Sequence, residues 1–277
     1  MEYLFDRELY FRRLRRTQSL RPDILSHAVA AELGERLEPI SRSFENACLI
    51  AIDPEPAAET LLASGKVRSL KILEPPVSGF LPLDPLSYNA IFNLFDLHLV
   101  NDVPGALIQM RQALQPDGLF MACLFASQTL TELRQSWLEA EELVTGGVTP
   151  RVIPMIDVRE LGGLLQRAGL ALPVVDLDRT LLRYPDAITL IHELRAFGLS
   201  NPMNGRSRKP VTRNLFGEAI SIYKQKFSDM DGRVRATIEV AWATAWAPHE
   251  SQQKPLKPGS AKFRLADALK VPQTKIQ

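Results

Sequence analysis

The clearest hydrophobic pattern of the chain lies in residues 88–125, and it predicts a strand, a helix and a second strand. Residues 88–95 are an apolar run too short for a helix and too continuous for a strand with one wet face, so we predict a strand buried on both sides. Apolar side chains then recur on one helix face, at Val103, Leu107, Met110 and Leu114. Residues 119–125 return as a second apolar strand, and this order is typical of a right-handed parallel crossover.

The boundaries of this unit have chemical causes. Asn101 and Asp102 offer capping side chains ahead of Pro104, whose fixed φ and missing N–H suit a first helical turn. The Pro-Asp-Gly triplet at 116–118 is expected to end the helix and turn the chain.

The remaining pattern extends this unit into an α/β fold. Further helices are expected at 22–37, 57–64, 157–168, 186–197 and 215–227, with one more opened by a capping box at Thr129–Glu132. Further strands are expected at 47–52, 70–73, 172–177, 180–183 and 237–246. The last of these alternates apolar and small residues, which favours a strand packed over the end of the sheet or next to a site.

Several motifs carry a resemblance to a known family. They are Phe5-Asp6-Arg7, the run at 97–102, and His249-Glu250-Ser251-Gln252 followed by Pro255 and residues 259–261. Residues 88–125 resemble the late half of the class I S-adenosylmethionine-dependent methyltransferase core. The motifs together are similar to the methyltransferase-like complex I assembly factor of mitochondria and its bacterial relatives, a cousin of the malonyl-carrier-protein methyltransferase.

The resemblance implies a Rossmann-like sheet, mostly parallel with an antiparallel last strand. It also implies a helical segment at 1–46, a core at 47–198 and a C-terminal lid or extension at 199–277. The first half of the sheet is expected to be shortened, because residues 74–87 contain four prolines and cannot form the crossover helix that a parallel connection usually needs.

The loop after the first strand departs from the family pattern. A working methyltransferase has an acidic-x-Gly-x-Gly loop there, in which the glycines let the backbone approach the cofactor. This chain has Asp53-Pro54-Glu55-Pro56 instead, and the two prolines remove two N–H donors.

The resemblance still assigns candidate site residues. For S-adenosylmethionine they are Asp53, Glu74, Asn93 and Leu94, and for catalysis His98, His249 and Glu250. Glu74 is alternatively an ordinary carboxylate at a strand end, and His98 a hydrogen-bonded core residue. The pair His249-Glu250 is either a general base with its partner or part of a polar C-terminal strap.

Two other stretches are open to a functional or a structural interpretation. The segment 148–155 lies on the substrate side in the family, but it is also explained as a surface strap. The cationic residues Arg206, Arg208 and Lys209, like the cluster at 12–16, suit either an anionic partner or simple solvation.

These features leave two hypotheses of different classes. The chain is either a transferase that uses S-adenosylmethionine or a related cofactor, or a relative that has lost the cofactor and serves as a binding or assembly protein. The family implies a respiratory-complex subunit as the partner, and one branch is credited with hydroxylating an arginine there. Fold alone does not decide between these activities.

Composition and charge narrow the setting. The net charge of +1 over 277 residues gives no bulk attraction to nucleic acid, and no apolar run approaches the ~20 residues of a membrane helix. Cys48 and Cys123 each lie in an apolar strand, so we expect buried thiols and no metal site. The acidic N-terminus is unlike a signal or transit peptide, which favours a bacterial cytoplasmic protein.

Overall fold

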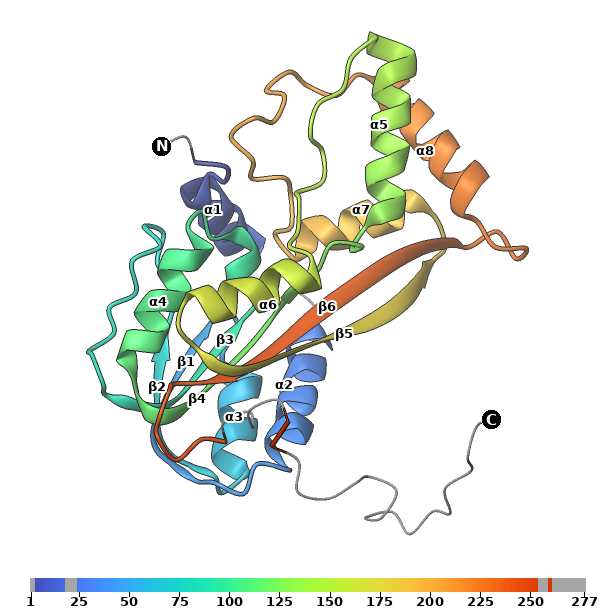
Figure 1. Ribbon diagram of the computed structural model, residues 1–277. Helices are drawn as coiled ribbons and strands as arrows, with labels where there is room; N and C mark the ends of the chain where they lie inside the picture. The colour runs from blue at the N-terminus through green and yellow to red at the C-terminus, as the bar shows by residue number, and fades with distance from the viewer. Residues whose placement is uncertain (1–2, 18–23, 254–258, 261–277) are drawn as a thin grey trace, which may run out of the picture.

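A central sheet with helices on both faces forms the body of the protein (Figure 1). The computed structural model describes residues 3–17, 24–253 and 259–260. Within them the sheet has the strand order β2-β1-β3-β4-β6-β5. The strands are β1 Phe44–Ala51, β2 Val67–Leu73, β3 Tyr88–Leu94, β4 Leu114–Phe125, β5 Ala171–Tyr184 and β6 Val234–Trp246.

The sheet is mostly parallel, as the resemblance implied. β2, β1, β3 and β4 are parallel neighbours, whereas β6 runs antiparallel to both β4 and β5. The parallel strands are apolar on both faces because helices cover both sides. In β1, Leu49 packs in the core on one face and Ile50 in the core on the other.

Helices complete two layers and a separate upper lobe. The helices are α1 Arg7–Thr17, α2 Ile24–Leu37, α3 Glu55–Ala63, α4 Val103–Ala113, α5 Thr131–Thr145, α6 Val158–Arg167, α7 Ala187–Ala196 and α8 Arg213–Phe227. α2 and α3 cover one face, and α4 and α6 cover the other. α5 and α8 pack together in the lobe, and α7 joins them around the part of β6 that extends beyond β4 (Figure 1).

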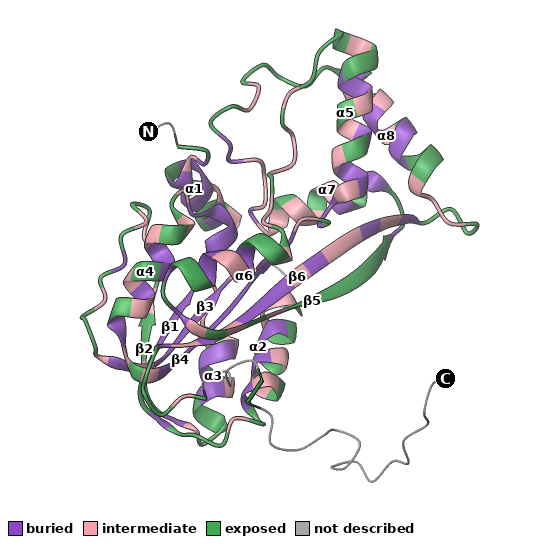
Figure 2. Cartoon of the chain, in the orientation of Figure 1, coloured by how far each residue is buried: buried purple, intermediate pink, exposed green. Residues whose placement is uncertain are grey.

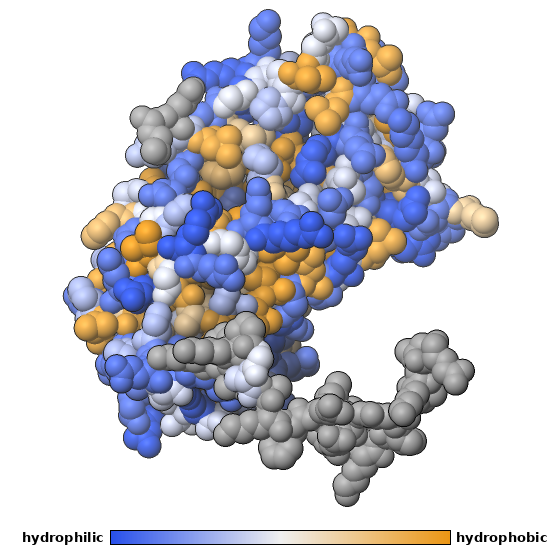
Figure 3. All heavy atoms as spheres, in the orientation of Figure 1, coloured by the Kyte–Doolittle hydropathy of each residue, from blue (hydrophilic) through white to orange (hydrophobic). Residues whose placement is uncertain are grey.

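The exposed surface reflects this layering. The distal half of β5 is exposed, and β5 is the edge strand of the sheet within the described residues (Figure 2). On the face shown in Figure 3, hydrophilic side chains cover most of the surface, with smaller hydrophobic areas between them.

Of two expectations about strands, one was wrong and the other was correct only in part. Residues 172–177 and 180–183 are not separate strands but parts of β5, which pairs without interruption with β6 from Val174 to Tyr184. The strand expected either over the end of the sheet or next to a site is β6, which does not cover the end but lies inside the sheet between β4 and β5, where Ile238 lines a cavity that also contains His98. The alternation of β6 arises because Trp242 packs on the α2 and α3 side while Ala241 and Ala243 pack on the opposite side.

The capping box expected at Thr129–Glu132 was also wrong. α5 begins after Leu130, whose φ is +55° and whose side chain caps nothing. Thr129 instead bonds the backbone of Glu239, and the Glu132 carboxylate accepts hydrogen bonds from the N–H and hydroxyl of Thr237. Tertiary contacts with β6 therefore took the polar groups that the local pattern assigned to a cap.

The expected boundaries of the central crossover are largely correct. Asp102 caps α4 by accepting the Gly105 N–H at 2.8 Å. Asn101 takes a different role and bonds both backbone polar groups of Phe5. β4 begins before the expected turn, at Leu114, and Asp117 has a φ of +64°. Residues 74–87 form turns but neither a helix nor a strand, and their prolines predicted the absence of a helix.

Candidate ligand site at the carboxyl ends of the strands

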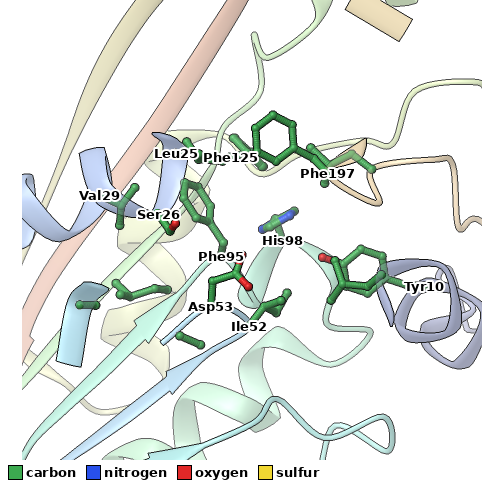
Figure 4. Close-up of a pocket in the computed structure, with 15 residues that line it drawn as sticks. Tyr10, Leu25, Ser26, Val29, Ile52, Asp53, Phe95, His98, Phe125 and Phe197 are labelled. Atoms are coloured by element: carbon green, nitrogen blue, oxygen red, sulfur yellow. The ribbon is translucent and has the colours of Figure 1, made fainter. Parts of the chain in front are cut away.

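A cavity opens where β1, β3 and β4 end at their carboxyl termini. We call it the His98 cavity; its volume is about 70 Å³, and α1, α2 and the segment 197–199 complete its walls. Its lining is mostly apolar and aromatic (Figure 4). Ligands of open α/β sheets bind at this edge, so the position is that of a candidate site.

His98 is the most unusual polar residue of this cavity. It lies in the 3₁₀ turn η2, Leu97–Leu99, directly after β3, and points into the cavity (Figure 4). Its side chain is 6% exposed, and within the described residues neither ring nitrogen has a hydrogen-bond partner. Burial, with a smaller contribution from Arg7, lowers the pKa of His98 to about 3. At neutral pH the ring is therefore uncharged, with one nitrogen able to donate and the other able to accept.

Two phenylalanine rings form an aromatic wall beside His98. Phe95 and Phe125 stack with their centroids 4.6 Å apart, and His98 meets Phe125 edge-on at 5.0 Å. Phe95 has a φ of +53°, a conformation that costs a non-glycine residue about 1–3 kcal/mol. Its N–H donates to the carbonyl of Cys123 at 2.9 Å, which helps to hold that conformation.

A buried ion pair ties α1 to this edge. The Arg7 guanidinium contacts the Asp96 carboxylate at 2.7 Å and donates to the carbonyls of Leu99 and Pro76, each at 3.0 Å. Both charged side chains are at most 5% exposed. Sequence reasoning used Arg7 only as part of a motif and missed Asp96. The available signal was a lone acid within the apolar run 94–100.

The residues predicted for the cofactor are only partly brought together. Asp53 and Leu94 line the His98 cavity. Asn93 is fully buried beside them, but strand alternation directs it to the opposite face, and its amide has no hydrogen-bond partner among the described residues. Glu74 is exposed and is not part of the lining.

The proline loop forms the start of α3. Pro54 occupies the N-cap position without a side-chain hydrogen bond, and Pro56 lies in the first turn. A helix N-terminus normally presents four free N–H groups, but Pro54 and Pro56 have none. The loop can therefore offer fewer backbone donors to an anion than the glycine-rich loop of the family.

The segment 148–155 is a roof over a second cavity of about 80 Å³ that also has His98 in its wall. Glu141 on α5 holds it, accepting hydrogen bonds from Thr149 at 2.5 and 2.7 Å and from Arg151 at 2.5 and 2.9 Å. Burial acts to raise the pKa of Glu141, but these hydrogen bonds outweigh it and lower the pKa below its usual value. Arg151 also lies over the ring of Trp137, 5.1 Å from its centroid.

His249 and Glu250 lie at the other edge of the sheet. They follow Trp246, which pairs with Leu119 at the start of the buried part of β4. Both side chains are exposed, and the His249 ring bonds the Ser251 hydroxyl at 2.7 Å. The structure therefore does not bring them to His98, and their catalytic role stays a prediction.

Known proteins are similar to this chain over most of its length. The arginine-hydroxylase NDUFAF5 of Danio rerio is 32% identical over 267 residues, which cover 90% of this chain and 83% of that protein. The chain belongs to the family of NDUFAF5. The protein of that name from Rattus norvegicus is 30% identical over 99% of the chain, and no family model matches the sequence.

Two more distant matches are to methyltransferases. The malonyl-[acyl-carrier protein] O-methyltransferase of Xylella fastidiosa is 32% identical over 61% of this chain and 55% of that protein. A methyltransferase structure from Bacillus halodurans aligns with 79% of this chain and 99% of its own, at a TM-score of 0.50 and 11% identity. At that identity the likeness shows the fold alone.

Neither a membrane-spanning helix nor a metal-binding cluster occurs among the described residues. None of their helices combines the length and apolar character that crossing a membrane requires. Nor do they contain a group of three or more His, Cys, Asp or Glu side chains placed to hold a metal ion.

Proposed function

We propose that this chain is a partner-directed member of the NDUFAF5 family, working in respiratory-complex assembly, with a pocket that no longer holds S-adenosylmethionine. The family relationship supports the fold and the assembly role. The geometry at the carboxyl ends of the strands supports the loss of the cofactor.

The residues of the pocket do not fit S-adenosylmethionine. The His98 cavity, at about 70 Å³, has room by itself for only a small group, so the adenosyl ligand would also have to occupy the larger opening that adjoins it. Pro54 and Pro56 have no backbone N–H to donate to the methionine end of the cofactor, and Glu74 lies outside the lining. We therefore derive no chemical step through this cofactor.

His98 then favours binding over acid catalysis. With a pKa of about 3, the buried imidazole is not protonated to imidazolium at neutral pH, so it cannot act as a general acid and is a weak base. A neutral ring with two unpartnered nitrogens is suited to hydrogen bonding an uncharged polar group.

Titration calorimetry with S-adenosylmethionine and S-adenosylhomocysteine tests the proposal directly. We expect no heat and no thermal shift at millimolar ligand. Micromolar binding, about −8 kcal/mol, would contradict the loss of the cofactor. Tryptophan emission during the same titration checks that the protein stays folded.

A transferase is the second candidate function, and one observation favours it. The cavity lies at the ends of β1, β3 and β4, and Asp53 lines it. If the cofactor binds after the walls move apart, Asp53→Asn is expected to weaken binding about tenfold, or 1.4 kcal/mol. The exposed Glu55→Gln in the same loop is the matched control.

The relatives' name adds a narrower hypothesis, that an arginine of the protein partner is the target. Mass spectrometry of the respiratory-complex subunits in cells with and without this chain tests it. A subunit arginine that carries one extra oxygen atom only when the chain is present would support it. Identical spectra would leave the assembly role without that modification.

A further inference from the structure

A much larger opening borders the His98 cavity. It lies between α2, α7 and the strands β5 and β6, has a volume of about 540 Å³, and is called here the ribbon groove. Its walls are largely apolar and include the aromatic rings of Phe125, Phe197 and Trp242. Ile24 at its rim is 70% exposed and Leu182 36%, so apolar surface faces solvent there.

The ribbon groove is continuous with the candidate site. The two openings share the lining residues Leu25, Val29, Phe125, Phe197 and Leu199. A side chain of a molecule seated in the groove can therefore extend toward His98. The groove can hold a larger ligand, whereas the His98 cavity has room only for a small group at the end of that ligand.

The charges around the groove are mostly acidic. Glu32, Asp178 and Glu193 lie in its lining. Glu32 pairs with Arg36 at 2.8 Å and Glu193 accepts the Tyr184 hydroxyl at 2.9 Å, whereas Asp178 has no ion pair among the described residues.

Arg183, the cation of the lining among the described residues, does not offset Asp178 or Glu193. Arg183 is engaged by Asp229 and Asp231, each at 2.7 Å, outside the groove. The groove therefore presents apolar walls together with the carboxylates of Asp178 and Glu193, which have no ion pair among the described residues, whereas Glu32 is paired with Arg36.

We propose that the ribbon groove is the docking site for a segment of the protein partner that combines apolar side chains with Lys or Arg. This inference rests on the proposed partner-directed function. Apolar side chains fill the groove, and the cations meet the carboxylates at its rim, which is the complementarity that guides specific association. The same carboxylates oppose an acidic segment and a membrane surface rich in anionic lipid.

The test uses two short amphipathic probe peptides with identical leucine positions, one carrying lysines and the other glutamates. Binding of each fluorescent peptide to the full chain is followed by anisotropy at low and at physiological salt. We expect the lysine peptide to bind at least about tenfold more tightly than the glutamate peptide, and more weakly as salt rises.

Variants locate the binding. The double variant Asp178→Asn, Glu193→Gln is expected to weaken binding of the lysine peptide about tenfold; the amide oxygen introduced at position 193 can still accept the hydrogen bond from Tyr184. Leu182→Asp is expected to weaken binding of the lysine peptide at least as much. Glu142→Gln and Leu143→Asp, both on the exposed face of α5, are the matched controls and should change nothing. Circular dichroism melts show whether each variant is folded.

Several results would overturn the inference. They are equal binding of the two peptides, no binding at millimolar peptide, and groove variants that behave like the α5 controls. If the chain binds phosphatidylserine vesicles but does not bind the lysine peptide, the surface is assigned to a membrane instead. Because no adenosyl ligand enters these measurements, their outcome is separate from the calorimetric test of the proposed function.

Discussion

The two edges of the parallel strands differ in how their motifs are held. At the carboxyl edge, Arg7, Asp96 and His98 are all buried, and His98 lines two cavities. At the amino edge, His249 and Glu250 are exposed on a loop fixed by hydrogen bonds from Gln252. Both edges carry motifs that resemble the same family, so a motif's likeness to a family does not say that its residues share one site.

The largest expected effect is at the buried ion pair. Arg7→Ala leaves the Asp96 carboxylate buried without its partner, and we expect a loss of about 3–5 kcal/mol in the free energy of unfolding. Urea denaturation followed by circular dichroism measures it, with the exposed Arg12→Ala on the same helix as control. A loss below about 1 kcal/mol would mean that α1 does not hold this edge.

The second effect is the pH dependence that His98 imposes. Its pKa is about 3 in the folded protein and about 6.5 when unfolded, so between these values the unfolded state binds more protons. Stability should therefore fall as the pH drops, by about 2 kcal/mol between pH 6.5 and 5 from this group alone.

His98→Leu should flatten that slope, because the substituted chain has no group there to protonate. His192→Gln, on the more accessible α7, is the comparison variant. Equal slopes in the native and His98→Leu proteins would show that the ring is not held neutral by burial.

A smaller effect is expected from the roof of the second cavity. Because the pKa of Glu141 is lowered on folding, its stabilisation is present above its unfolded pKa of about 4.3 and is lost as pH falls toward the folded pKa. Glu141→Gln should cost about 1–2 kcal/mol at pH 7 and less near pH 3. Thermal melts at both pH values measure this, and an effect that grows on acidification would contradict the assignment.

The smallest effect is expected at the amino edge. His249→Ala and Glu250→Gln remove exposed side chains and should each change the unfolding free energy by no more than about 0.5 kcal/mol. Neither should alter peptide binding at the ribbon groove. A marked loss of stability or of peptide binding would show that residues of both edges act together in one site, contrary to the separation described above.

Local sequence rules predicted the central unit because local physics decides it there. The apolar run at 88–95 had to be buried on both faces, and Asp102 before Pro104 had to cap a helix. Where such rules failed, distant partners competed. Thr129 and Glu132 look like a capping box, but β6 supplied better partners in Glu239 and Thr237.

The candidate site was predictable only in part for the same reason. His98 and Asp53 follow strands, so their place at the carboxyl edge could be inferred from the sequence. Arg7 lies 89 residues from Asp96 along the chain, and no spacing rule pairs them. The ribbon groove is formed by elements far apart in sequence and has no local signature at all.

The sequence by itself determined the strand and helix types, the absence of a helix in residues 74–87, and the prolines in place of a glycine-rich loop. These follow from hydrophobic period and from the fixed φ and missing N–H of proline, which act over a few residues. Tertiary structure alone decided that β6 enters the sheet, that His98 is buried and neutral, and that His249 and Glu250 lie at the opposite edge, while Pro255 and Ala261 of the same motif lie outside the described residues. Each of these depends on which surfaces meet, and burial and charge act between residues that only folding brings together.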